Sequence, residues 1–70
     1  MAAQLQRPGS KAADVRNLLK ALRSLTPKQL FVRLVCADTV EVTGEAGKEL
    51  STTEKALTYF DRHGWKLTTQ

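Results

Sequence analysis

The chain has 70 residues, a formal net charge of +4 and a single cysteine. This length predicts one small domain of marginal stability, and a lone cysteine excludes both an internal disulfide and a cysteine cluster for zinc. The lone cysteine also favours a reducing setting, so we expect a cytoplasmic protein. No apolar run reaches the ~20 residues of a membrane span, so we expect no membrane contact. The basic charge is concentrated in residues 1–33, where Asp14 is the only acidic side chain.

Residues 1–10 contain Pro8, Gly9 and Ser10 but few apolar side chains that could pack. This composition is typical of a mobile terminal segment. We therefore predict a flexible basic arm over residues 1–10, followed by a single domain over residues 11–70.

Residues 12–25 have the clearest helical periodicity in the chain. Apolar side chains recur there at three- and four-residue steps, which predicts an amphipathic helix. Arg16, Lys20 and Arg23 are spaced so that they share the opposite face as one basic row. The Thr26-Pro27 pair ends the helix, because proline disfavours helical backbone in the residue before it.

The apolar run at residues 30–36 permits two interpretations. Its β-branched residues favour a buried strand, which would pair with an alternating strand at residues 40–43. A helix over residues 28–37 is the alternative, because short apolar runs discriminate poorly between the two. The glycines at positions 44 and 47 predict a loop between the second strand and the next helix.

The final third of the chain contains helix start and stop signals. Ser51 and Glu54 form an S-x-x-E capping box, which predicts a helix start at that point. Gly64 supplies a left-handed helix end and places Phe60 and Trp65 at the two positions whose side chains touch in a Schellman motif. The alternating residues 65–68 then predict a strand.

These elements together predict an α+β domain in the order helix, strand, strand, helix, strand. Two helices would cover one face of a mainly antiparallel, three-stranded sheet in two layers. If residues 28–37 were helical, the product would be a three-helix domain with a small β-ribbon.

Residues 56–67 read A-L-T-Y-F-D-R-H-G-W-K-L. This pattern resembles the ending A-L-x-Y-[FLM]-x-x-x-G-W-x-[LF] of small, mostly uncharacterised bacterial and phage-type α+β domains. The resemblance covers the last quarter of the chain. It implies a helix-to-strand corner in a prokaryotic or phage protein, and it implies no activity and no functional residues.

Catalytic chemistry has little support in the sequence. Cys36 lies in an apolar run and His63 near a helix end, and both are explained by local structure. We therefore expect a non-enzymatic protein without a metal or a cofactor.

The leading functional hypothesis is a small binding module that makes a regulatory or accessory contact with a protein partner or with a second copy of itself. Tyr59 is the candidate protein contact, because it lies beside the apolar face of its helix. Nucleic-acid binding through the basic first half is the alternative. The candidate contacts for that alternative are Arg7, Lys11, Arg16, Lys20 and Arg23.

Overall fold

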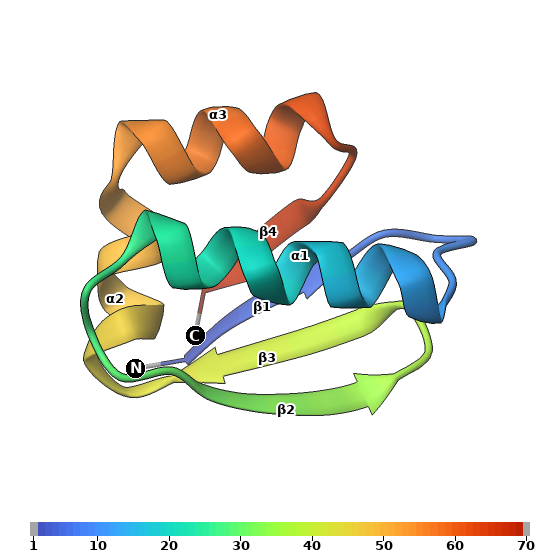
Figure 1. The fold of residues 1–70 in the computed structure, drawn as a ribbon, viewed down its shortest axis with the longest axis horizontal. Coiled ribbons are helices and arrows are strands. Elements are labelled where there is room, and N and C mark those ends of the chain that lie inside the picture. The colour runs from blue at the N-terminus through green and yellow to red at the C-terminus, as the bar shows by residue number, and fades with distance from the viewer. Residues whose placement is uncertain (1, 70) are drawn as a thin grey trace.

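Seven helices and strands make up the fold in the computed structural model, which describes residues 2–69 (Figure 1). In chain order they are β1 (Ala2–Gln6), α1 (Ala12–Leu25), β2 (Phe31–Cys36), β3 (Thr39–Thr43), α2 (Gly44–Thr52), α3 (Glu54–Arg62) and β4 (Lys66–Thr69). The predicted α+β class is confirmed, with one more strand and one more helix than expected.

The four strands form one sheet in the order β2-β3-β1-β4, and every neighbouring pair is antiparallel. With α2 and α3 counted as one interrupted helical segment, the chain follows a β-α-β-β-α-β path. This is the split β-α-β arrangement of ferredoxin-like domains. The sheet therefore has two free edges, one on β2 and the other on β4.

The predicted flexible arm over residues 1–10 is wrong, because β1 is a central strand. Ala3 pairs with Val42 of β3 on one side and with Thr69 of β4 on the other. Ala3 and Leu5 are both buried. The alternation of small or apolar residues with glutamines is a strand pattern, but it is too short to stand out until two neighbouring strands flank it.

Helix α1 occupies the predicted residues and packs its apolar face on the sheet. Val15, Leu18 and Leu22 are buried, and Leu19 and Leu25 are half-buried beside the core. The helix ends at Leu25, as the Thr26-Pro27 pair predicted. Figure 1 places α1 between α3 and the β2 side of the sheet.

Strand β2 settles the ambiguity over residues 30–36 in favour of a strand, so the three-helix alternative is wrong. It forms a hairpin with β3 around Ala37 and Asp38. The prediction that this strand is buried is also wrong, since every one of its residues is exposed.

Helix α2 replaces the loop expected after β3. Gly44 begins it with φ +79°, and Ala46, Gly47 and Leu50 are buried, so packing outweighs the low helix propensity of the two glycines. The capping box predicted at Ser51 is wrong. The Ser51 hydroxyl donates to the carbonyl of Lys48 at 2.8 Å, inside α2, and α3 begins after Thr53.

The corner between α3 and β4 has the predicted Schellman geometry. Gly64 has φ +79°, its amide donates to the Asp61 carbonyl at 3.3 Å, and the Trp65 amide donates to the Phe60 carbonyl at 2.8 Å. Phe60 and Trp65 both lie in the buried core. Among the described residues, no helix is long and apolar enough to cross a membrane.

Candidate binding surface beside strand β2

The most unusual surface of the domain is its β2 edge. Four large apolar side chains of β2 are exposed, namely Phe31 (55%), Val32 (38%), Leu34 (58%) and Val35 (42%). Isolated exposed apolar residues are common, but four of them within five residues of a free edge strand are typical of an interaction site. By contrast, the other edge strand, β4, has only four residues, and Leu67 is its one large apolar residue.

The strand register divides these side chains between the two faces of the sheet. Val32 lies opposite Val42 and Leu34 opposite Val40, so both point toward the helix-covered face with the buried valines of β3. Phe31 lies opposite Thr43 and therefore belongs to the uncovered face.

Two neighbouring hollows separate α1 from β2, and we call them together the α1–β2 groove. One measures about 400 Å³ and is lined by Val15, Arg16, Leu19 and Leu34 among others. The second measures about 570 Å³ and is lined by Leu19, Arg23, Leu30 and Val32 among others. Leu19 lines both, so the groove runs along the length of β2. It exists because α1 covers the centre of the sheet and leaves β2 uncovered.

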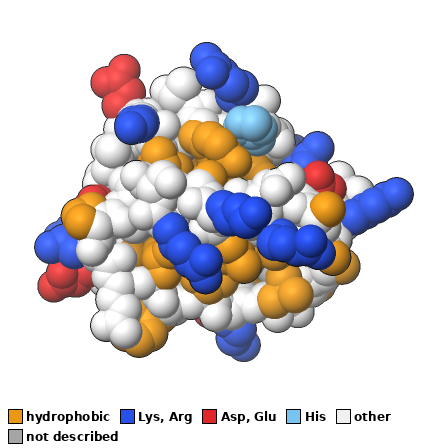
Figure 2. Space-filling view, in the orientation of Figure 1, with side chains coloured by type: hydrophobic (Ala, Val, Ile, Leu, Met, Phe, Trp, Pro, Cys, Tyr) orange, Lys and Arg blue, Asp and Glu red, His pale blue; other side chains and the backbone are white. Residues whose placement is uncertain are grey.

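A row of cations borders this groove. The lining includes Arg16 at one hollow and Arg23 at the other, and Lys20 lies between them on α1. All three are exposed, and none forms a salt bridge with a described residue. Figure 2 shows Lys and Arg side chains gathered over α1, with hydrophobic side chains on either side of them and acidic ones toward the margin.

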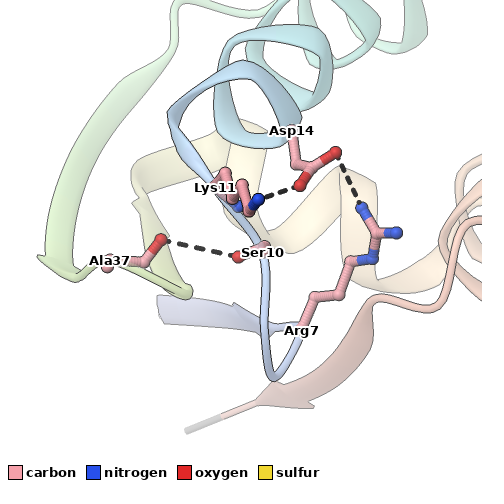
Figure 3. Close-up of polar contacts among 5 residues, drawn as sticks. All are labelled: Arg7, Ser10, Lys11, Asp14 and Ala37. Atoms are coloured by element: carbon pink, nitrogen blue, oxygen red, sulfur yellow. Dashed lines mark hydrogen bonds and ion pairs between the residues drawn. The ribbon is translucent and has the colours of Figure 1, made fainter.

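The other two predicted nucleic-acid contacts lie apart from this row, near the start of α1. Arg7 Nη1 is 3.1 Å from Asp14 Oδ1, and the Lys11 amide donates to Asp14 Oδ2 at 2.8 Å (Figure 3). The hydrogen bond donated by the Lys11 backbone amide, together with the charge of Arg7, lowers the pKa of the Asp14 carboxyl below its ordinary value of 3.8. The charge of Arg7 is therefore partly compensated within the fold.

Tyr59, the predicted protein contact, lies in a different region from β2. It is half-buried, its ring is 4.2 Å from the His63 ring between centroids, and it lines a hollow of about 650 Å³ with Leu25 of α1. This hollow lies between α1 and α3, so α1 separates it from the α1–β2 groove.

The uncovered face of the sheet has no aromatic platform on its central strands. RNA-binding domains with a four-stranded sheet of this kind stack bases on aromatic residues of the sheet. Here the corresponding face carries Gln4 and Gln6 of β1 and Glu41 and Thr43 of β3. Glu41 is also negatively charged, and its Oε1 accepts a hydrogen bond from Arg33 Nε at 3.3 Å. The two central strands of this face therefore lack an aromatic platform for base stacking, and Phe31 lies apart from them on the edge strand β2.

The cysteine and the histidine of the chain lie in different parts of the fold. Cys36 is an exposed free thiol at the end of β2, whereas His63 follows α3 and stacks on Tyr59. Within residues 2–69, no group of three or more His, Cys, Asp or Glu side chains is placed to hold a metal ion.

Comparison with protein-family models, with curated proteins and with solved structures finds no match to this chain. Its fold is therefore assigned from its own topology, and its candidate surface from its own chemistry. Sequence reasoning missed the β2 surface because the apolar run resembles a core strand. Arg33 in the middle of that run was the one local signal of exposure.

Proposed function

We propose that this protein is a non-enzymatic binding module, and that the β2 edge receives an extended segment of a protein partner. The observation that carries the proposal is the exposed apolar side chains of β2 on an edge strand that no described element covers. An added strand would bond to the free backbone groups of β2, and its side chains would enter the α1–β2 groove. This is the β-augmentation mode of peptide recognition.

The experiment is an NMR titration with seven-residue strand-forming peptides in acidic, neutral and basic versions. We expect at least one version to shift the β2 amides and the side chains of the α1–β2 groove. The proposal is wrong if no peptide of any charge binds with a Kd of about 1 mM or lower, which corresponds to a binding free energy of about −4 kcal/mol. It is also wrong if the shifts lie elsewhere.

Leu34→Lys is the edge-blocking variant for this test. Leu34 is 58% exposed, so we expect the change to alter the free energy of unfolding by no more than about 0.5 kcal/mol. A lysine on an edge strand opposes strand addition, so binding of the neutral peptide should fall at least about tenfold. Leu57→Lys is the matched control, because Leu57 is 39% exposed on α3, and it should bind like the parent. Equal losses in both variants would contradict the β2 assignment.

Nucleic-acid binding is the second candidate, and the free cations of α1 favour it. The triple change Arg16→Ala, Lys20→Ala, Arg23→Ala should weaken binding to any nucleic-acid sequence alike. It should also reduce the slope of log affinity against log salt by about one unit per lost phosphate contact. If the parent binds neither DNA nor RNA at low salt, this candidate is excluded. If the triple variant binds equally well, the row has no role in binding.

A further inference from the structure

The α1–β2 groove combines apolar walls with positive charge, and this combination restricts what can occupy it. The apolar lining consists of Val15, Leu19, Leu30, Val32 and Leu34. Arg16 supplies a cation at one hollow, and Arg23 and Lys28 supply cations at the other, where Lys28 Nζ is 3.6 Å from Glu45 Oε2. No acidic side chain lines either hollow. The two arginines have no salt-bridge partner within residues 2–69, so their charge is free for a ligand.

We infer that the occupant of the β2 edge is an acidic strand of another protein, with carboxylates on the face that points toward α1. The inference rests on the proposed function and specifies the chemistry of the partner. Each carboxylate would pair with one arginine, and the apolar side chains between them would fill the groove. Complementary charge of this kind sets specificity and register at interfaces more than it sets affinity.

The spacing of the two arginines fits this arrangement. Arg16 borders the hollow beside Leu34, and Arg23 borders the hollow beside Val32, so α1 runs opposite to β2 along the groove. Seven helical residues separate the arginines by about 10 Å along the axis. Two same-face strand residues four positions apart are separated by about 13 Å. The long arginine side chains cover this difference.

A second copy of the chain is a poorer occupant for the same electrostatic reason. Antiparallel pairing of two β2 strands would place two α1 helices on the same side of a joined sheet. The junction would then contain Arg16 and Arg23 from both copies, with no acidic residue in the groove lining to offset them. Like charges brought together across an interface disfavour that partner.

The test uses the full chain and a fluorescein-labelled peptide, Thr-Glu-Val-Ile-Val-Glu-Thr, whose two glutamates share one strand face with the isoleucine. The matched probe replaces both glutamates by lysine. By fluorescence anisotropy at low salt, we expect the acidic peptide to bind about tenfold more tightly than the basic one. This preference should shrink as added salt shortens the screening length below ~10 Å.

The double variant Arg16→Ala, Arg23→Ala should weaken binding of the acidic peptide about fivefold, the loss expected for two exposed ion pairs. The control Lys55→Ala, Lys66→Ala removes the same charge from exposed positions on α3 and β4, and should bind like the parent.

Three results would overturn the inference. If the two peptides bind equally, the edge accepts a strand without selecting its charge, and the proposed function survives alone. If sedimentation shows a dimer whose β2 amides are protected from hydrogen exchange, the occupant is a second copy. If single-stranded RNA or DNA displaces the acidic peptide and binds more tightly than it, through Arg16 and Arg23, the surface belongs to a nucleic acid.

Discussion

Replacement of Trp65 by alanine tests the corner on which the last helix and strand depend. Trp65 is 4% exposed, belongs to the main core cluster and follows the left-handed Gly64. A buried aromatic side chain removes about 150–250 Å² from water, which corresponds to about 4–6 kcal/mol at ~25 cal/mol per Å². Since alanine retains part of that contact, we expect Trp65→Ala to cost about 3–5 kcal/mol.

A 70-residue domain has a total stability of about 4–10 kcal/mol at the usual per-residue value, so the variant should be largely unfolded or close to it. The measurement is urea denaturation followed by far-UV circular dichroism, since the variant loses the only tryptophan. Trp65→Phe is the control and should cost about 1–2 kcal/mol, because most of the apolar volume remains. If Trp65→Ala unfolds cooperatively at nearly the parent's urea midpoint, the packing of this corner has been misjudged.

Two further predictions concern the backbone and the acid stability of the fold. Gly64→Ala should lower the free energy of unfolding by about 1 kcal/mol, because Gly64 has φ +79°, a conformation that alanine disfavours. An added Cβ would not clash, since the nearest atom, Arg7 Nε, would lie 3.7 Å from it in van der Waals contact. An unchanged urea midpoint would argue against a left-handed residue there. For Asp14, a folded-state pKa below the ordinary value means that its stabilising effect is present above about pH 4 and is lost as pH falls through the lowered pKa. The difference in unfolding free energy between the parent and Asp14→Asn should therefore be largest near about pH 6 and shrink in acid, and a constant difference would refute the linkage.

The parts of the fold that were predictable from sequence are those fixed by local signals. Helix α1 was predictable because five apolar residues repeat at helical spacing over its whole length. The α3–β4 corner was predictable because Gly64 places Phe60 and Trp65 at positions that meet in a Schellman ending.

The errors arise where distant residues decide local structure. Strand β1 has only Ala3 and Leu5 as buried residues, and its partners lie in β3 and β4. Helix α2 forms despite two glycines because Ala46 and Leu50 are buried. The local sequence shows neither which strands flank β1 nor which side chains of α2 are buried.

The candidate site was only half predictable. The basic row of Arg16, Lys20 and Arg23 follows from helical spacing alone, and it lies on one exposed face as expected. The apolar half was missed because the exposure of β2 depends on how far α1 reaches across the sheet. The same run of apolar residues would be expected in a strand that α1 covers, so the run alone does not reveal the exposure of β2.

The pairing of β1 with β4 joins the two most distant strands of the chain. Gln6 pairs with Lys66 and Ala3 with Thr69, close to the largest sequence separation that residues 2–69 allow. Contacts between residues so far apart in sequence slow folding, because closing the long loop costs entropy before the contacts can stabilise the fold. During synthesis, β1 leaves the ribosome first but cannot complete its pairing until residues 66–69 have emerged. In that interval the edge of β2 and the edge of β1 that β4 later covers are both exposed. This small domain should therefore be most prone to aggregation before β4 is in place.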